Sequence, residues 1–242
     1  MENTKRLLEN GYDESYAKYC DHTVLRAYTK SSVVREFCEE AIKYNAAAVC
    51  VNPIHVSLVH SILKGTGIKT ATVIGFPLGA TKTSVKAFET AEAVADGADE
   101  VDMVINIGAL RENDTETVLK DIEAVVKAAG NADVKVIIEC CYLTDEEKAT
   151  ACELCIKAGA KFVKTSTGMG TGGATVHDVE ILTKTADGRI CVKASGGVDD
   201  RSTAYAMICA GAERLGVSKV PQIVEDDTSI ISASKRNAPP KF

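Results

Sequence analysis

Three charged side chains lie inside segments of the sequence that otherwise predict buried β-strands: Asp102, Lys164 and Lys193. Strands of a parallel sheet are covered on both faces and are therefore almost wholly apolar. An unpaired charge in such a strand costs several kcal/mol, so these groups must pair with one another or line a wet cavity. Two amines and a carboxylate are also the groups that nucleophilic and acid–base chemistry requires.

Two lysines in one confined site are expected to lower each other's pKa, because each disfavours the charged form of the other. A lysine that is neutral near neutral pH is a nucleophile and can form a Schiff base with a carbonyl compound. The iminium then accepts electrons, so that a neighbouring carbon–carbon bond can break or form. Asp102 could relay protons through a bound water and hold the second ammonium group. The spacing alone leaves open which of Lys164 and Lys193 is the nucleophile.

Each charge taken alone also has a structural interpretation. It could belong to a polar plug inside the fold, or its side chain could extend outward between helices with the charged end in water. Convergence of two lysines and an aspartate from three strands favours a functional site. Glu100 and Asn106 share the face of Asp102, and Glu139 ends another predicted strand.

Eight short β-rich stretches alternate with helical patterns along the chain, as in parallel β units joined by helices. The predicted strands are 18–22, 47–51, 69–75, 100–107, 134–140, 160–166, 189–195 and 213–217. Clear helical patterns cover 83–95, 115–129 and 145–158, and a short helix is expected at about 3–11. Thr144 and Glu147 have the spacing of a capping box before the third of these helices.

The arrangement favours a closed (β/α)8 TIM barrel of class α/β, formed by one domain spanning 1–242. Glycine recurs between a helix and the next strand in D-G-A-D-E-V, A-G-A-K-F-V and A-G-A-E-R-L, where it suits a left-handed helix end. An open doubly wound sheet is the alternative. In a barrel, residues late in the strands face the C-terminal mouth, where active sites are built.

Glycine-rich turns follow the last three predicted strands. They read T-S-T-G-M-G-T-G-G-A-T (165–175), S-G-G-V (195–198) and L-G-V-S-K (215–219). Such turns let backbone N–H groups approach an anion, and barrels commonly bind phosphate after strands seven and eight. Serine hydroxyls and Lys219 could contribute, although each turn alone could be ordinary turn chemistry. The G-x-G-x-x-G spacing of the first turn follows strand six, which argues against a dinucleotide-binding unit.

Composition narrows the class of protein further. The chain has 242 residues, of which 45% are hydrophobic and 26% charged, and a net charge of −6. These values exclude disordered and low-complexity chains and argue against non-specific nucleic-acid binding. We see no membrane span and no signal peptide, so we expect a cytoplasmic protein.

The nine cysteines are expected to be reduced thiols, with no disulfide framework. The C-x-x-C pair Cys152 and Cys155 falls within a helical pattern and has no second pair, and Cys50 could face the barrel mouth. Metal signals are weak because the spacing of His55 and His60 does not place them on one helix face. The other two histidines, His22 and His177, are expected to cap helices or form hydrogen bonds, and no metal or other cofactor is predicted.

The chain resembles the deoxyribose-phosphate aldolases, class I aldolases with a (β/α)8 barrel, from Asp21 to about Ser218. The matching segments are D-H-T-V-L, A-A-V-C-V-N-P, F-P-L-G-A-T-K-T-S-V-K-A-F-E, G-A-D-E-V-D-M-V-I-N-I-G-A-L, K-V-I-I-E, F-V-K-T-S-T-G and V-K-A-S-G-G-V. The resemblance implies that Lys164 forms the Schiff base, that Lys193 lowers its pKa and takes part in proton transfer, and that Asp102 relays protons. We also expect substrate or phosphate contacts from Asp21, Thr23, Thr165, Gly168, Gly196, Gly197, Gly216 and Ser218.

The implied reaction is the reversible cleavage of 2-deoxy-D-ribose 5-phosphate to D-glyceraldehyde 3-phosphate and acetaldehyde, in deoxyribonucleotide catabolism. Its partners are phosphorylated sugars and short aldehydes, and we expect a homo-oligomer, a dimer or tetramer, that contacts neither nucleic acid nor membrane. The chain departs from the family at Lys219, where many members have a second serine, and at its end, Lys241-Phe242, where some have a tyrosine that assists proton transfer.

Two other functions compete with the aldolase hypothesis. A phosphosugar isomerase or epimerase on the same barrel would use the phosphate turns with an acid–base pair and would need no amine nucleophile. A catalytically silent barrel would bind only a metabolite or a partner. Trapping a Schiff base with borohydride separates the three hypotheses.

Overall fold

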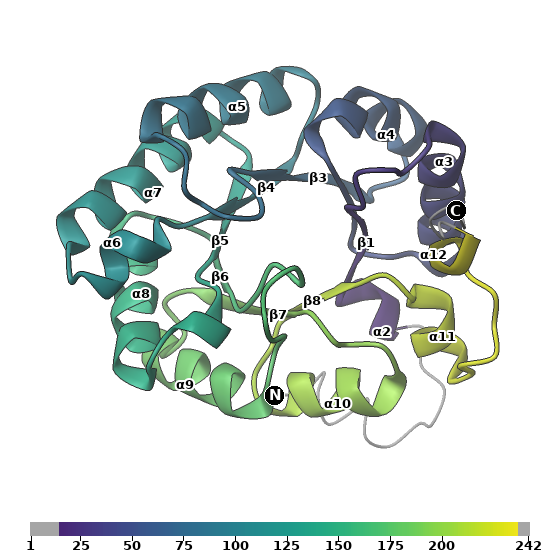
Figure 1. Ribbon diagram of the computed structural model, residues 1–242. Helices are drawn as coiled ribbons and strands as arrows, with labels where there is room; N and C mark the ends of the chain where they lie inside the picture. The colour runs from purple at the N-terminus through teal and green to yellow at the C-terminus, as the bar shows by residue number, and fades with distance from the viewer. Residues whose placement is uncertain (1–14, 237–242) are drawn as a thin grey trace, which may run out of the picture.

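Eight parallel strands form a closed barrel in a computed structural model, which describes residues 15–236 (Figure 1). The strands are β1 (Cys20–Val24), β2 (Ala48–Val51), β3 (Lys69–Ile74), β4 (Glu100–Val104), β5 (Asp133–Ile137), β6 (Phe162–Lys164), β7 (Cys191–Ser195) and β8 (Arg214–Val217). They pair in sequence order, and β1 pairs with β8. This last pairing confirms the (β/α)8 barrel and excludes the open sheet.

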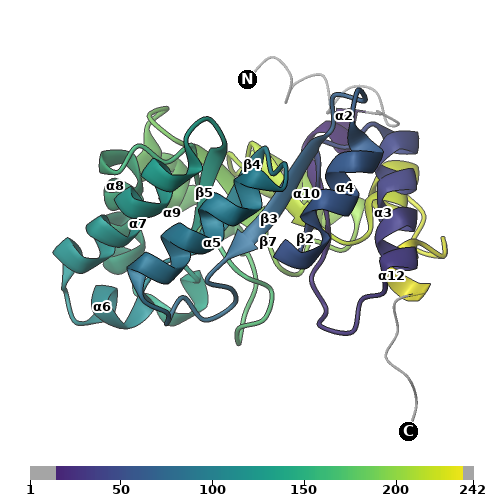
Figure 2. The ribbon, with the colours of Figure 1, turned by 90° about the horizontal axis from the view of Figure 1, so that it is seen from above.

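Helices surround the barrel, as Figures 1 and 2 show. They are α2 (Ser15–Lys18), α3 (Ser31–Tyr44), α4 (Val56–Leu63), α5 (Thr83–Ala95), α6 (Ile107–Arg111), α7 (Thr115–Ala129), α8 (Asp145–Lys157), α9 (Val176–Ala186), α10 (Arg201–Cys209), α11 (Val220–Glu225) and α12 (Ala233–Arg236), with short 3-10 turns at Pro53–His55 and Cys140–Tyr142. No helix among residues 15–236 is both long and apolar enough to span a membrane.

All eight predicted strands are present, and most are shorter than predicted. The first is displaced to Cys20–Val24, because residues 15–18 form a helix. The fourth ends at Val104, since Asn106 caps α6 by accepting a hydrogen bond from the Ala109 N–H at 3.1 Å. The fifth ends at Ile137, and the chain turns at Glu139, whose φ is 58°.

The helix predictions agree more closely with the structure. The predictions 83–95 and 115–129 are confirmed, and 145–158 is confirmed as far as Lys157. The capping box is also present, with Thr144 accepting from the Glu147 N–H at 3.3 Å and Glu147 accepting from the Thr144 N–H at 2.7 Å. The predicted helix at 3–11 lies outside the described residues.

Two separate cores result from the barrel. The larger one is apolar and fills the layer between the outer face of the strands and the helices. Inside the barrel there is a small apolar cluster, made of Ala48, Cys50, Ala71 and Val73, against which Leu25 and Phe76 pack. The barrel interior also holds buried charged side chains, among them Asp102, Lys164 and Lys193, and this is where the candidate functional groups lie.

Candidate active site

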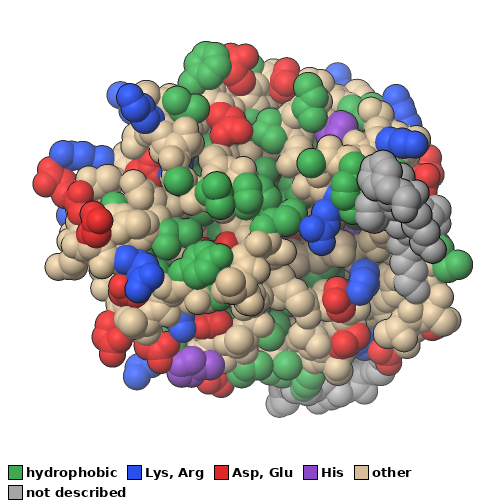
Figure 3. Space-filling view, viewed as in Figure 1, with side chains coloured by type: hydrophobic (Ala, Val, Ile, Leu, Met, Phe, Trp, Pro, Cys, Tyr) green, Lys and Arg blue, Asp and Glu red, His purple; other side chains and the backbone are tan. Residues whose placement is uncertain are grey.

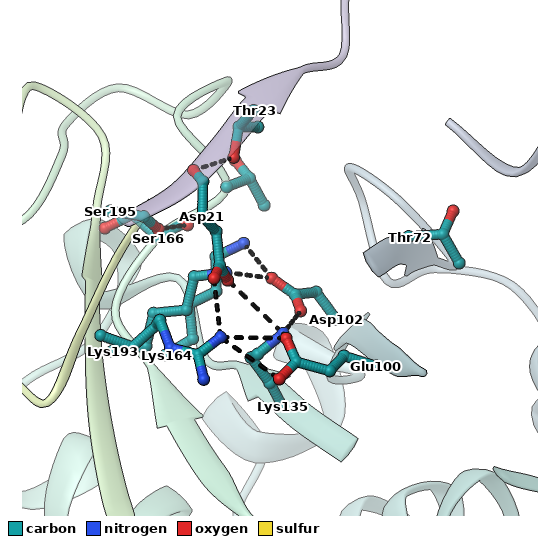
Figure 4. Close-up of polar contacts among 12 residues, drawn as sticks. Asp21, Thr23, Thr72, Glu100, Asp102, Lys135, Lys164, Ser166, Lys193 and Ser195 are labelled. Atoms are coloured by element: carbon teal, nitrogen blue, oxygen red, sulfur yellow. Dashed lines mark hydrogen bonds and ion pairs between the residues drawn. The ribbon is translucent and has the colours of Figure 1, made fainter. Parts of the chain in front are cut away.

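A cluster of charged side chains fills one side of the barrel interior (Figure 4). Its members, which we call the barrel charge cluster, are Asp21, Glu100, Asp102, Lys135, Lys164, Lys193 and Arg214. They come from six strands, and the strand register places Lys164 beside Lys193 and Asp102 beside Lys135. The parallel register thus brings together the three residues predicted to perform the chemistry.

Asp102 is the centre of this cluster. Its Oδ2 accepts hydrogen bonds from Lys164 Nζ and from Lys193 Nζ, each at 2.7 Å. Its Oδ1 accepts from Lys135 Nζ at 2.9 Å. One carboxylate therefore contacts three amines, and a single oxygen joins the two lysines that were predicted to act together.

The other members of the cluster form further ion pairs around these groups. Lys135 Nζ lies 2.5 Å from Glu100 Oε2, and Arg214 Nη1 lies 2.7 Å from Asp21 Oδ1. Asp21 also accepts a hydrogen bond from Lys193 Nζ. Lys193 is thus held between two carboxylates, whereas Lys164 pairs with one carboxylate of the described residues, Asp102.

This difference in partners separates the pKa values of the two lysines. Burial lowers the pKa of Lys164, the charge of Lys193 lowers it further, and Asp102 only partly opposes the shift. Burial also acts against the charge of Lys193, but Asp102 and Asp21 outweigh it and raise the pKa of Lys193. Mutual lowering of both pKa values, expected from the sequence, is therefore wrong for Lys193.

Counting charges leads to the same assignment. The cluster contains three carboxylates and four basic groups, so full ionisation would leave an excess positive charge inside the barrel. Lys135, Asp102 and Asp21 are strongly held in their charged forms, since burial is outweighed by their opposite neighbours, which raise the pKa of Lys135 and lower those of the two carboxyls. The lowered pKa of Lys164 acts against this excess.

Lys135 and Arg214 belong to the cluster, although they were not among the predicted site residues. Both interrupt predicted strands, at K-V-I-I-E and at E-R-L-G-V. The criterion that identifies Lys164, a charge inside an apolar strand, applies equally to them and could have found them. Asp21, predicted to bind substrate, is fully buried in the cluster, and its backbone carbonyl accepts a hydrogen bond from Thr23 Oγ1 at 2.8 Å.

The apolar side of the barrel interior faces the amines. Val73 pairs in register with Asp102 on the neighbouring strand, and Ala71 pairs with Glu100. Cys50 lies within electrostatic range of Lys164 and Lys193, and burial raises the pKa of its thiol to about 11, so it is a neutral group here. Cys50, for which the sequence suggested a position facing the barrel mouth, is fully buried in the small apolar cluster inside the barrel.

At the mouth of the barrel, the loop after β6 is fixed against the end of β7. The Thr165 hydroxyl accepts a hydrogen bond from the Ser195 N–H at 3.1 Å, and the Ala174 N–H donates to the Gly196 carbonyl at 3.0 Å. A Cβ on Gly173 would lie 2.3 Å from that carbonyl oxygen, so this position requires glycine. Thr165 therefore uses its hydroxyl to hold the loop.

The remaining predicted phosphate contacts lie on adjacent turns. Gly196 and Gly197 have φ values of 87° and 79°, a backbone conformation that favours glycine. Gly168 also has a positive φ, and its Cα lies near that of Gly196. Gly216 is confined by the Ser195 side chain, and Ser218 is half-buried after β8.

Glu139, predicted to end a strand, has no contact with the lysines. Its carboxylate accepts hydrogen bonds from the Thr167 N–H at 3.2 Å and from the Thr167 hydroxyl at 2.5 Å. These hydrogen bonds attach the loop after β6 to the residues that follow β5. Cys141 Sγ lies 3.9 Å from Glu139, and Cys140 is buried; nothing in the structure explains why both are cysteines.

Two of the histidines pair with carboxylates. His22 Nε2 lies 2.9 Å from Glu40, and His177 Nε2 lies 2.7 Å from Asp145. Cys152 and Cys155 are both buried in α8. Within the described range 15–236, no group of three or more His, Cys, Asp or Glu side chains could hold a metal ion.

The face of the molecule that carries these loops is shown in Figure 3, where hydrophobic side chains gather over the centre. Two of the exposed ones come from mouth loops, Leu78 after β3 and Met169 after β6. The fold and the site thus define a class of protein: a (β/α)8 barrel whose interior holds a buried amine of lowered pKa in contact with a carboxylate.

Comparison with known proteins identifies the family. A sequence model of the DeoC/LacD aldolase family matches residues 16–218, and the chain belongs to this family. A deoxyribose-phosphate aldolase of Geobacillus sp. (strain WCH70) is 54% identical over 218 residues, covering 90% of this chain and 98% of the relative. Another, from Bacillus cereus (strain AH820), is 56% identical over 212 residues, covering 87% and 95%.

Solved structures agree with this assignment. A tetrameric deoxyribose phosphate aldolase from Aeropyrum pernix superposes with a TM-score of 0.85 at 31% identity, covering 93% of this chain and 96% of that chain. An aldolase named QR15 gives a TM-score of 0.84 at 44% identity, covering 87% and 95%. The protein is an aldolase, an enzyme of the carbon–carbon lyase class.

Proposed function

We propose that this aldolase cleaves 2-deoxy-D-ribose 5-phosphate reversibly to D-glyceraldehyde 3-phosphate and acetaldehyde, through a Schiff base on Lys164. The observation that carries the proposal is the contact of one Asp102 oxygen with both Lys164 and Lys193 at 2.7 Å, combined with the opposite pKa shifts of the two lysines. An amine nucleophile must be neutral, and Lys164 is the one of these two lysines whose surroundings lower its pKa.

The first step uses the open-chain aldehyde of the sugar. The lone pair of Lys164 Nζ forms a bond to C1, and the carbonyl oxygen takes up a proton to give a carbinolamine. Loss of water from C1 leaves an iminium ion joined to Lys164. Asp102, whose carboxyl pKa is held well below its usual range, stays ionised beside this cation despite its burial.

The second step breaks the carbon–carbon bond. The C3 hydroxyl loses its proton to a water that Asp102 and Lys193 orient, and a carbonyl forms at C3. The electron pair of the C2–C3 bond moves to C1–C2 while the iminium nitrogen takes up the π electrons, which gives an enamine and releases D-glyceraldehyde 3-phosphate. Protonation of C2 and hydrolysis of the resulting iminium then release acetaldehyde and restore the Lys164 amine.

The phosphate end of the sugar is assigned to the turns after β7 and β8. Gly196 and Gly197 supply backbone N–H groups, and Ser218 supplies a hydroxyl. Thr165 and Gly168 contribute indirectly. The Thr165 hydroxyl binds the Ser195 N–H and Gly168 packs close to Gly196, so both position the loop after β6 beside the phosphate turn. The apolar side of the barrel interior takes the two-carbon donor, which has no hydrogen-bonding group beyond its carbonyl.

In this proposal the enzyme acts in deoxyribonucleotide catabolism in the cytoplasm, as a single-domain homo-oligomer. The tetrameric relative supports the oligomer, and the phosphorylated substrate of the relatives, as their names give it, supports the choice of sugar.

Product analysis tests the proposed reaction. The protein is incubated with 2-deoxy-D-ribose 5-phosphate in excess EDTA, and the products are followed by NMR. The proposal predicts equal amounts of acetaldehyde and D-glyceraldehyde 3-phosphate. An isomer of the starting sugar would instead indicate an isomerase or epimerase, and an unchanged sugar would indicate a silent barrel.

A further inference from the structure

Lys219 and Asp199 form an ion pair between the two turns to which we assign the phosphate. Lys219 directly follows Ser218 at the end of β8, and Asp199 lies two residues after Gly197 in the loop that follows β7. The Nζ–Oδ1 distance is 3.1 Å. Figure 1 shows these two loops side by side. An ammonium group therefore lies within reach of a site that was assigned only backbone groups and one hydroxyl.

The pair is weakly held. The Lys219 side chain is 32% exposed and that of Asp199 is 57% exposed. Ion pairs at such positions contribute only about 0–1 kcal/mol to stability. Lys219 precedes α11 and its side chain forms no cap hydrogen bond there. The ammonium group can therefore change partner at little cost in folding free energy.

Asp199 has no helix to cap, in contrast to its neighbour. The Asp200 carboxylate accepts hydrogen bonds from the Thr203 N–H at 2.8 Å and from the Ser202 hydroxyl at 2.7 Å, so its charge is used at the start of α10. The carboxylate of Asp199 is directed to Lys219 instead. A carboxylate beside an anion site repels the anion unless a cation neutralises it.

We propose that Lys219 contacts the substrate phosphate and exchanges Asp199 for it when the sugar phosphate binds. A phosphate group carries a charge of about −1.5 to −2 and three acceptor oxygens, and thus competes well against one exposed carboxylate. Lys219 then favours phosphorylated over unphosphorylated sugars, and Asp199 limits that preference by competing for the ammonium. This inference rests on the proposed function.

Four proteins test the exchange: wild type, Lys219→Gln, Asp199→Asn and the double variant. The measured quantity is the ratio of kcat/KM for 2-deoxy-D-ribose 5-phosphate to kcat/KM for 2-deoxy-D-ribose. Lys219→Gln is expected to lower the ratio about tenfold, mainly through a higher KM for the phosphorylated sugar. Asp199→Asn is expected to raise it about threefold, because it frees the ammonium. Lys161→Gln, an exposed lysine before β6, is the matched control and should leave the ratio unchanged.

The double variant separates contact from neutralisation. If Lys219 contacts the phosphate, the double variant remains as low as Lys219→Gln. Recovery of the wild-type ratio in the double variant would show that Lys219 only shields Asp199, and an unchanged ratio in Lys219→Gln would also overturn the exchange. A wild type that cleaves neither sugar would instead refute the proposed function, and one without preference for phosphate would refute the assigned phosphate turns.

Discussion

The two sides of the barrel interior differ in chemistry, although the same alternation of inward and outward residues produces both. On one side the inward positions of β4 to β8 and β1 carry seven charged groups. On the other, the inward positions of β2 and β3 carry Ala48, Cys50, Ala71 and Val73. Charge and small apolar side chains meet at Asp102, which is in register with Val73.

This contrast explains how the pKa of one lysine can be lowered while its neighbours stay charged. An apolar interior alone would lower the pKa of any lysine but would leave it without orientation. A fully paired cluster alone would keep every amine charged, as happens to Lys193 between Asp21 and Asp102. Lys164 has the single carboxylate partner and is the outermost amine of the three lysines, with 3% exposure. It is therefore the one whose pKa is lowered.

A second buried lysine outside the barrel interior shows what a purely structural pair looks like. Lys86 on α5 donates to Asp121 on α7 at 2.5 Å and to the Val104 carbonyl at 2.8 Å, and it is fully buried. One amine thus meets one carboxylate. The barrel charge cluster differs because its basic groups, three amines and the Arg214 guanidinium, outnumber its three carboxylates, and this is the feature that points to chemistry.

Replacing Lys193 is expected to have the largest effect on kcat/KM. Lys193→Leu should lower kcat/KM about 100-fold near neutral pH, because Lys164 gains positive character and the oriented proton-transfer group is lost. The fold should remain, since Asp21 keeps Arg214 and Lys135 as partners and Asp102 keeps Lys164. Circular dichroism and steady-state kinetics measure the two effects.

Lys86→Leu is the matched control for that variant. It removes an equally buried lysine from the α5–α7 pair and leaves Asp121 without its ammonium partner. This variant should lose about 3–5 kcal/mol of stability while the folded protein keeps its activity. Full activity of Lys193→Leu near neutral pH would remove Lys193 from the mechanism.

The pH dependence should follow the lowered pKa of Lys164. Only the neutral amine attacks, so kcat/KM should fall about tenfold per pH unit below that pKa and reach a plateau above it. Lys193→Leu should move this fall in kcat/KM to higher pH, because a charge that lowers the pKa of Lys164 is removed. Asp102→Asn should move it to lower pH, since Asp102 raises that pKa. Shifts in the same direction for both variants would contradict the assignment.

A larger side chain on the apolar side of the barrel interior should have a smaller effect on kcat/KM. Ala71 is fully buried beside the charged side, and Ala71→Val adds two methyl groups where we place the two-carbon donor. We expect kcat/KM to fall about threefold to tenfold, with acceptance of larger donor aldehydes reduced more than that of acetaldehyde. Ala204→Val, in the outer core on α10, should affect stability alone. Equal kinetic effects of the two variants would argue against the apolar side as the donor site.

Much of this architecture could be predicted from the sequence. The alternation of strand and helix patterns predicts the barrel, and charges inside strands identify Lys164, Lys193 and Asp102 as a group. The strand ends could not be predicted, because they depend on caps such as Asn106 and on the turn at Glu139. The order of the two lysine pKa values depends on which carboxylates lie near each amine. Those distances are set by the strand register and by the depth of each side chain in the barrel, and the spacing of residues along the chain does not give them.

We expect Lys164 to be the amine that forms the Schiff base, and reductive trapping tests this directly. Borohydride is added to the enzyme with acetaldehyde, and the modified protein is digested and sequenced by mass spectrometry. We expect an N-ethyl group on Lys164, which is lost in Lys164→Met and retained in Lys161→Met. An adduct on Lys193 or Lys135, or no adduct inside the barrel while the enzyme cleaves its substrate, would contradict it.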